Sequence, residues 1–288
     1  MSEFQTGNVD LTDLAREIGW REAIAQQFDS AAYLTDQRRR MFLDLLPLGG
    51  ADVLEIGPGF GQFTDAISRR AHSVEALEVD PEQADFIREK LRQEELTNVR
   101  VTTGGSDCYL PYPDSSFDLI ILNLVLEWCA TRLEEPHEVA QRRLVREAWR
   151  VLRPNGRIYV ATKNRFALRY LLGKADEHYA GMRFGSALPR RLADWFHGRR
   201  SRGRLYSWRG LRQLLIEAGF DVEQSWWAAP EMRFPDAMVP VDVRSIRLAR
   251  RAGIRQGDSR SVRLLTSLCP AVAVKHLAPG LSFLARRI

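Results

Sequence analysis

Apolar and polar residues follow a regular order along the chain from residue 51 onwards. Short apolar runs, typical of buried strands, are separated by segments in which apolar residues recur at helical spacing. The runs predict seven strands, at 51–56, 73–79, 99–103, 117–123, 157–162, 220–227 and 280–286. Between them we expect helices at 61–70, 81–95, 139–152 and 208–218. Such alternation builds right-handed βαβ units, so we predict an α/β fold with a doubly wound, seven-stranded, mostly parallel sheet.

The segments outside this alternation suggest four parts. Leu11, Leu14 and Ile18 recur at helical spacing before the first strand. Two later stretches are too long for ordinary loops, and such stretches are usually lids or binding elements. The predicted parts are a helical N-terminal extension, a core, a lid or acceptor insertion, and a C-terminal part of the sheet with a basic insertion, at 1–50, 51–162, 163–206 and 207–288 respectively.

Composition places the chain among globular proteins. It has 288 residues, of which 45% are hydrophobic and 27% are charged. Its net charge of +5 is unevenly distributed, because residues 1–150 carry −11 and residues 151–288 carry +16. A basic half rich in arginine favours a polar or anionic partner.

Several classes of protein are disfavoured. No apolar run approaches the roughly 20 residues that a membrane span needs. Residues 1–10 are polar and acidic, unlike a secretory signal. Cys108, Cys129 and Cys269 are odd in number and far apart, which favours neither a disulfide framework nor a zinc cluster. We therefore expect a cytoplasmic protein without a metal site.

The first predicted strand leads into a glycine-rich turn, Glu55-Ile-Gly57-Pro-Gly59-Phe-Gly61. The glycines allow a tight turn and a close approach of the backbone to a ligand. Their spacing differs from the Gly-x-Gly-x-x-Gly of dinucleotide-binding folds, and no P-loop sequence occurs in the chain. In open α/β sheets, ligands bind at the carboxyl ends of the strands, where this turn lies.

This turn resembles motif I of class I S-adenosylmethionine-dependent methyltransferases of the small-molecule type. The similarity extends through residues 51–162. The resemblance implies a Rossmann-like methyltransferase fold, S-adenosylmethionine as the methyl donor, and donor contacts from Glu55, Gly57, Gly59 and Gly61.

The resemblance also implies an acidic residue that holds the donor's ribose at the end of the second strand. Glu78, followed by Val79, has this position. A carboxylate can accept two charge-assisted hydrogen bonds, as two ribose hydroxyls require. Asp80 is better interpreted as the N-cap of the next helix, because Pro81 follows it at the first helical position.

Further donor contacts are implied after the third and fourth strands. The family's adenine-binding acidic residue aligns with Ser106, and Asp107 lies one residue later. We assign Asp107 to this role, with a backbone contact at Cys108 as the alternative. Asn123, at the end of the fourth strand, is expected beside the methionine part of the donor.

Two residues are candidate general bases for the acceptor. His178 lies in the run Asp176-Glu-His-Tyr, and a histidine beside a carboxylate can deprotonate a hydroxyl. Glu127, just past the fourth strand, is the second candidate. The competing interpretations are a solvated surface histidine and a residue at the start of a helix.

Two basic segments have open interpretations. The run 199–204 is either a solvated loop or an anion clamp. The second segment interleaves Arg244, Arg247, Arg250 and Arg251 with apolar residues. It is either a helix on a membrane surface or, as we favour, a helix packed on the sheet edge.

The resulting prediction is a methyltransferase acting on an oxygen of a small polar or anionic acceptor. The expected setting is glycan or specialised-metabolite biosynthesis, and the expected state is a monomer or homodimer. The Asn/Asp-Pro-Pro-Tyr/Phe signature of amino methylation does not occur. An RNA methyltransferase and a non-catalytic protein of the same fold remain alternatives. Nucleic acid is disfavoured as a partner because no RNA-binding module is apparent.

Overall fold

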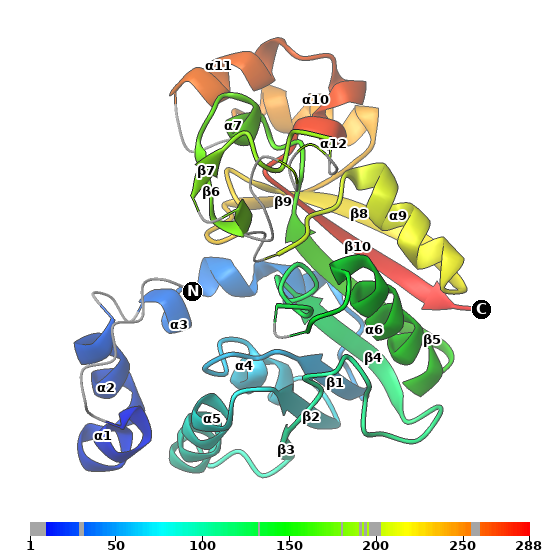
Figure 1. Cartoon of the computed structure of the whole chain (residues 1–288). Helices are drawn as coiled ribbons and strands as arrows, with labels where there is room; N and C mark the ends of the chain where they lie inside the picture. Colours follow the sequence, from blue (N-terminus) through cyan, green and yellow to red (C-terminus); the bar gives the residue numbers. More distant parts are fainter. Residues whose placement is uncertain are drawn as a thin grey trace. The chain divides into compact units, whose positions relative to one another are not determined.

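The computed structural model describes residues 10–28, 32–131, 133–179, 181–189, 192, 195, 203–254 and 260–288. The chain forms two compact units, residues 1–105 and 106–288 (Figure 1). Arg199 to Arg202 of the basic run lie outside the described residues. Among the described residues, none of the helices has both the length and the apolar character that crossing a bilayer demands.

The first unit contains three parallel strands in the order β3-β2-β1. Their bounds are Asp52–Ile56 for β1, Ser73–Glu78 for β2 and Val99–Thr103 for β3. Val74 is paired with Val53 on one side and with Val99 on the other, so β2 is the central strand of this unit. The three strands predicted here are confirmed.

Helices α4 (Thr64–Ser68) and α5 (Pro81–Gln93) follow β1 and β2. The N-cap predicted at Asp80 is confirmed, because its carboxylate accepts a hydrogen bond from the Glu82 N–H at 3.1 Å. Before β1, the described residues form four helices, which are α1 (Leu11–Ile18), α2 (Trp20–Gln27), α3 (Ala32–Thr35) and the 3-10 helix η1 (Gln37–Leu45).

Within its described residues, the second unit contributes five strands to the main sheet, in the order β4-β5-β10-β8-β9. Strands β4 and β5 are parallel, whereas β10 runs antiparallel to both β5 and β8, and β9 runs antiparallel to β8. Their bounds are Phe117–Asn123 for β4, Leu152–Lys163 for β5, Phe220–Ala229 for β8, Ala237–Pro240 for β9 and Gly280–Arg287 for β10.

The two units together contribute eight strands to this α/β architecture, rather than the seven predicted. The additional strand is β9, which lies within the stretch 230–278 that departs from the alternating pattern. Four residues ending in a proline give too short a run to predict a strand, and such short strands are typical of sheet edges.

Helices α6 (His137–Val151) and α9 (Trp208–Glu217) are those predicted in the second unit. Ser207 caps α9, accepting a hydrogen bond from the Gly210 N–H at 3.2 Å. The two long insertions contain short elements, which are α7 (Leu168–Leu171), β6 (Ala175–Asp176), η2 (Glu177–Tyr179), β7 (Met182–Arg183), α10 (Val243–Arg251), α11 (Arg260–Leu268) and α12 (Ala271–Leu277).

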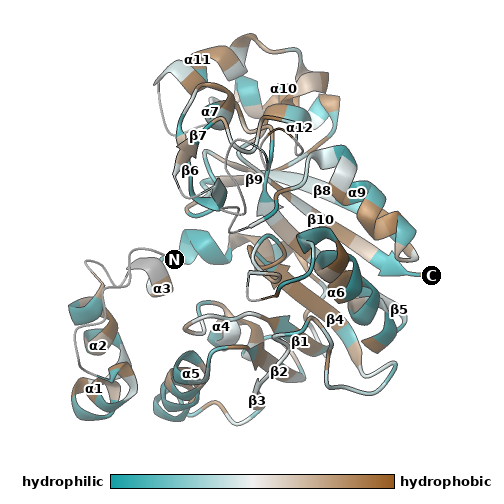
Figure 2. Ribbon diagram, in the orientation of Figure 1, coloured by the Kyte–Doolittle hydropathy of each residue, from teal (hydrophilic) through white to brown (hydrophobic). Residues whose placement is uncertain are grey.

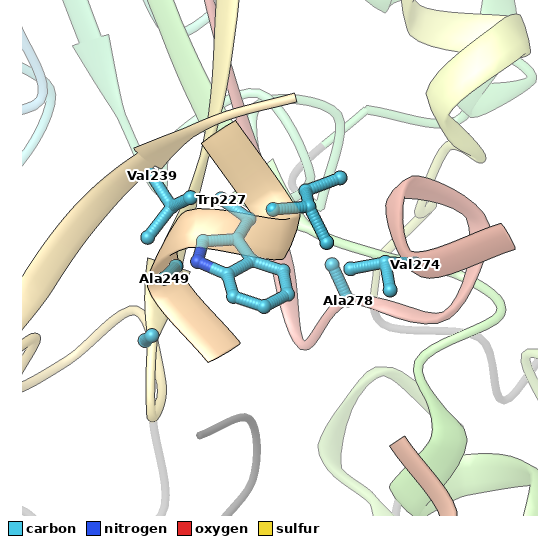
Figure 3. Packing of buried hydrophobic residues seen from close by; sticks show 7 residues of the cluster. Trp227, Val239, Ala249, Val274 and Ala278 are labelled. Atoms are coloured by element: carbon cyan, nitrogen blue, oxygen red, sulfur yellow. The ribbon is translucent and has the colours of Figure 1, made fainter. Parts of the chain in front are cut away.

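Helix α10 packs against the edge strand β9, which confirms the favoured interpretation of this arginine-rich segment. Its apolar side chains Ile246 and Ala249 join a buried cluster with Trp227 of β8 and Val274 of α12 (Figure 3). The cluster anchors the late insertion to the sheet. The arginines of α10 therefore belong to a helix with one buried face.

Candidate functional site

The turn after β1 is built from backbone conformations that favour glycine. Gly57, Gly59 and Gly61 have φ values of +66°, +60° and +70°. A Cβ at Gly61 would lie 3.4 Å from Ile87 Cγ1, so the constraint at this position comes from the backbone conformation rather than from lack of space. The three glycines are thus required by local geometry, and they place several backbone amides at the carboxyl end of β1.

Glu78 holds this turn from the end of β2. Its Oε2 accepts a hydrogen bond from the Gly59 N–H at 2.9 Å, and its Oε1 accepts from the Val79 N–H at 2.8 Å and from the Asp80 N–H at 3.1 Å. Burial raises the pKa of the carboxyl, and these amides partly oppose the rise. Of the residues predicted to bind the donor, Glu78, Val79 and the three glycines are brought together.

Glu55 lies near the end of β1, just before the glycine turn, and is buried. Its Oε2 accepts a hydrogen bond from the Thr64 hydroxyl at 2.6 Å. Burial raises its pKa to about 7, although the Thr64 hydroxyl and the nearby ammonium of Lys90 favour the charged form. Glu55 therefore ties the last residues of β1 to the first residue of α4.

Sequence analysis missed Lys90, which is fully buried in α5. Its ammonium donates to the Gly61 carbonyl and lies 3.1 Å from Asp65 Oδ1, while Arg40 pairs with the same carboxylate at 2.9 Å. The Lys90 Nζ also lies 4.8 Å from the centroid of the Trp20 ring. The N-terminal extension and α5 thus meet at the end of the glycine turn.

A local signal for Lys90 exists in the sequence. Phe86 and Lys90 are four residues apart, so both lie on the same face of α5, and that face is buried. A lysine at a core position of an amphipathic helix needs a partner, because an unpaired buried charge is costly.

The donor-binding candidates of the second unit are Asp107, Cys108 and Asn123. Asp107 is exposed, and its Oδ1 accepts a hydrogen bond from the Tyr109 N–H at 3.0 Å. Cys108 is buried with a φ of +64°, and its Sγ lies 3.5 Å from the Cys129 carbonyl oxygen. Asn123 is half-buried at the last position of β4. Their roles toward the donor remain predictions.

His178 and Asp176 form a buried pair, and both side chains are 0% exposed. The Nδ1 of His178 lies 2.9 Å from Asp176 Oδ1, and Asp176 Oδ2 accepts from the N–H and the hydroxyl of Ser186. Burial would raise the pKa of Asp176, but the hydrogen bonds from His178 and Ser186 hold it below its usual value. A carboxylate in this position fixes the proton on Nδ1 and leaves Nε2 as the acceptor.

The other ring nitrogen of His178 is the unusual feature of this pair. Its Nε2 is buried and has no hydrogen-bond partner among the described residues. The ring stacks on Trp128 with centroids 4.5 Å apart, which fixes its plane. His178 is therefore an oriented acceptor, and the interpretation of it as a solvated surface histidine is wrong.

Glu127 lies close to His178 and is also buried. Neither carboxylate oxygen has a hydrogen bond of acceptable geometry within the described part of the chain. Burial raises its pKa, whereas His178 and the Thr162 hydroxyl favour the charged form. The residue is not at a helix start, because α6 begins at His137, and Glu127 lies in the turn region after β4.

Basic side chains lie near Glu127, one of the two candidate bases. Burial, together with the charges of Arg169 and Arg233, lowers the pKa of Lys163, at the end of β5, to about 8. The Lys163 ammonium forms an ion pair with Glu177. The second unit thus gathers His178, Glu127 and several cations within the insertions and the ends of β4 and β5.

The end of the basic run has a structural role. The Arg204 guanidinium pairs with Glu138 at 2.6 Å and with the Gln141 side-chain oxygen at 2.9 Å, and the backbone N–H of Arg204 donates to the Glu127 carbonyl at 2.9 Å. Arg204 is therefore engaged by α6 and by the turn that carries Glu127. Arg204 is thus neither part of a solvated loop nor free to clamp an anion, the two interpretations given for the run 199–204.

Comparisons with known proteins agree with this architecture. A family profile described as "Methyltransferase domain" matches residues 54–160. The chain is 34% identical over 156 residues to the biotin biosynthesis bifunctional protein BioHC of Cellvibrio japonicus. This match covers 54% of this chain and 28% of that protein. It is 31% identical over 155 residues to a malonyl-[acyl-carrier protein] O-methyltransferase of Halorhodospira halophila. This match covers 53% of this chain and 49% of that protein. The matches thus span about half of the latter relative and less of the former.

Solved structures extend the likeness to most of the chain. The geranyl diphosphate C-methyltransferase of Streptomyces coelicolor A3(2), solved with Mg2+, geranyl diphosphate and S-adenosyl-L-homocysteine, has a TM-score of 0.54. The similarity covers 93% of this chain and 83% of that chain at 14% sequence identity. Identity this low shows the fold alone, and that fold is the Rossmann-like one predicted from the sequence.

Proposed function

We propose that this chain, whose residues 54–160 form a class I S-adenosylmethionine-dependent methyltransferase domain, methylates an oxygen of a small polar or anionic acceptor. The methyl donor of this class is S-adenosylmethionine, whose sulfonium supplies an electrophilic methyl group. We favour oxygen as the methylated atom because Nε2 of His178 is buried and has no hydrogen-bond partner among the described residues. A base so placed is useful where a hydroxyl must lose its proton as it is methylated.

The first unit fits the nucleoside part of the donor. Oε2 of Glu78 accepts one backbone hydrogen bond and keeps a lone pair for a ribose hydroxyl, whereas Oε1 already accepts two backbone hydrogen bonds. Gly57, Gly59 and Gly61 carry no side chains, so a ligand can approach the backbone closely at these three positions. We propose that Glu78 binds the ribose and that the glycine turn accommodates the rest of the nucleoside.

The second unit fits the acceptor. Asp176 fixes the proton on His178 Nδ1, so Nε2 can accept the hydroxyl proton, and Asp176 then stabilises the imidazolium that forms. The Lys163 ammonium lies near Glu127 and Asp176, and Arg169 and Arg233 add positive charge around Lys163, which favours a carboxylate or phosphate elsewhere on the acceptor. We propose a hydroxyl-bearing anion, with Glu127 as a second polar contact.

The chemical class of the acceptor is also a proposal. One relative is named for methylation of a malonyl-[acyl-carrier protein], so a malonyl thioester belongs in any panel of acceptors. Hydroxy acids, sugar acids and phenolic acids complete the panel, in keeping with glycan or specialised-metabolite chemistry. The monomer or homodimer expected from the sequence remains a prediction.

The test compares the full-length protein with its His178→Gln variant. S-adenosylhomocysteine release is measured over the acceptor panel, and its dissociation constant is measured by calorimetry. On a hydroxyl acceptor we expect kcat to fall by about 10²–10⁴-fold with donor-product affinity unchanged. His72→Gln is the control, because the His72 side chain is 73% exposed and lies in the first unit.

The outcomes separate the candidate functions. Asp176→Asn should lower kcat similarly without weakening S-adenosylhomocysteine binding, because the amide favours the wrong histidine tautomer. A carboxylate acceptor needs no base. Methylation of the malonyl thioester by His178→Gln at an unchanged kcat would therefore contradict the proposed role of His178 as a general base. Donor binding without methylation of any acceptor would favour the non-catalytic alternative.

A further inference from the structure

Helix α11 leaves its leucines exposed to solvent. Val262 and Thr266 are 7% and 5% exposed, whereas Leu264, Leu265 and Leu268 are 62%, 39% and 73% exposed. The three leucines recur at i, i+1 and i+4, so they share one side of the helix. Helices on the surface of a globular protein normally bury this stripe. We call Leu264, Leu265 and Leu268 the α11 apolar face.

The buried core of the insertion does not need this face. Ile246 of α10 and Val274 of α12 fill the cluster around Trp227 (Figure 3). Helix α11 is joined to α10 by a hydrogen bond from Arg250 Nη2 to the Thr266 carbonyl at 2.6 Å. This contact is made on the buried side of α11, so it leaves the leucines exposed. Figure 2 shows the resulting hydrophobic segments on α11.

Helices α10, α11 and α12 carry basic side chains, and the nearest acidic residue that the structure describes before α10 is its N-cap, Asp242. Residues 243–254 and 260–277 contain no aspartate or glutamate. The same segments contain Arg244, Arg247, Arg251, Arg263 and Lys275, and the first four of these are exposed. Apolar side chains with arginines beside them match a surface that is apolar inside and negatively charged outside.

We propose that the α11 apolar face and the arginines of α10 bind the surface of an anionic lipid membrane. Leucines would enter the acyl-chain boundary, while arginines reach the lipid phosphates from long flexible side chains. The aliphatic composition favours lipid over a protein partner, because leucine and valine are under-represented and tryptophan and tyrosine enriched among the energetic centres of protein interfaces.

This surface bears on the acceptor site. Helix α11 packs against α7, and α7 carries Arg169, whose charge acts on Lys163. If the proposed function holds, a membrane-bound α11 keeps that cationic group close to the lipid surface. The acceptor class would then include amphipathic anions dissolved in the membrane. Vesicle binding itself does not depend on the proposed function and is tested without it.

The test is co-sedimentation of the full-length protein with vesicles. One set contains phosphatidylcholine alone, and the other contains equal parts of phosphatidylcholine and phosphatidylglycerol. We expect binding to the anionic set that is at least about tenfold stronger at low salt than at 0.5 M NaCl, because salt screens the phosphate contacts.

Two variants separate the apolar from the charged contribution. The double variant Leu264→Glu with Leu268→Glu should lower the vesicle partition coefficient at least about tenfold, since apolar burial is replaced by repulsion. Arg247→Gln with Arg251→Gln should abolish the preference for anionic vesicles. Val139→Glu is the matched control, because Val139 is also an exposed apolar residue, 48% exposed, on α6. Circular dichroism verifies that each variant is folded.

Three outcomes would overturn the proposal. One is equal sedimentation of the wild type with and without vesicles. Another is equal binding of the Leu264→Glu, Leu268→Glu variant and the Val139→Glu control. The third is a lipid-free dimer that the leucine substitutions dissociate, measured by analytical ultracentrifugation, without vesicle binding by the wild type. That result would assign the face to a second copy of the chain.

Discussion

The ammonium of Lys90 donates a hydrogen bond to the carbonyl oxygen of Gly61, the last glycine of the turn after β1. The two residues are 29 positions apart, and both belong to the first unit. Lys90 shares Asp65 with Arg40 of the N-terminal extension. The conformation of the glycine turn is therefore coupled to a buried ion network and not only to its own sequence.

We predict that Lys90→Met weakens binding of S-adenosylhomocysteine at least about fivefold. The variant removes the hydrogen bond to Gly61, which is worth about 1.5–3 kcal/mol when the donor is charged. Arg88→Met on the same helix is the control, because Arg88 is exposed. Calorimetry on folded protein measures the affinity. Lower thermal stability with unchanged affinity would assign Lys90 a purely structural role.

Glu78→Ala should raise the dissociation constant of S-adenosylhomocysteine at least tenfold, an expectation of about 1.4 kcal/mol or more. The substitution removes the proposed ribose contacts and also releases the Gly59 N–H. Glu78→Gln separates the two effects, because an amide oxygen can still accept from Gly59 but lacks the charge. Affinity that survives both substitutions would contradict the assignment to the ribose.

The strands that carry the candidate site were predictable because they are buried. Leu119 to Leu122 of β4 are all 0% exposed, and a continuous apolar run indicates a strand covered on both faces. Strand β9 was not predictable, because four residues at an edge bury too little to leave a pattern. The split of the N-terminal extension at Gly19 and Asp36 likewise depends on local caps that periodicity does not resolve.

The site was predictable where its contacts are local. The glycine spacing and the position of Glu78 are local features, and Asp176 lies two residues before His178. The burial of His178 was not predictable, because it depends on stacking against Trp128, fifty residues away in the sequence. The grouping of Lys163 with Arg233 depends on two insertions folding together, and no periodicity records that.

The stability of the first unit should depend on pH through Glu55. Its pKa is raised from 4.5 to about 7, so its stabilising neutral form is fully present at low pH and is lost as pH rises through 7. Glu55→Gln keeps an acceptor for Thr64 but does not titrate. Between pH about 5 and about 8, urea unfolding should show the wild type losing up to about 3 kcal/mol relative to the variant.

The control for this experiment is Glu17→Gln, because Glu17 is exposed on α1. Its stability should follow that of the wild type across the same pH range. Parallel profiles for the wild type and Glu55→Gln would show that Glu55 titrates at its ordinary value.

Gly203→Ala should impair the acceptor site without affecting the donor turn. A Cβ at this position would lie 2.8 Å from the Glu127 carbonyl oxygen, 3.1 Å from His178 Cδ2 and 3.2 Å from Trp128 Cε3. The backbone oxygen cannot move easily, so the added methyl group must displace the turn of Glu127 and the His178 ring. A shift of about 1 Å in a base can cost about 10²-fold in rate. We expect kcat to fall by at least about tenfold, with the affinity for S-adenosylhomocysteine unchanged.

Gly49→Ala provides the comparison, because a Cβ there meets nothing within 4 Å. That variant should match the wild type in both measurements. If Gly203→Ala also matched the wild type in kcat, then neither Glu127 nor His178 would need its present position for catalysis. The base would have to be sought elsewhere, or the acceptor would be one that ionises unaided. A loss of donor affinity in Gly203→Ala would instead mean that the substitution disturbs more of the protein than the cluster it touches.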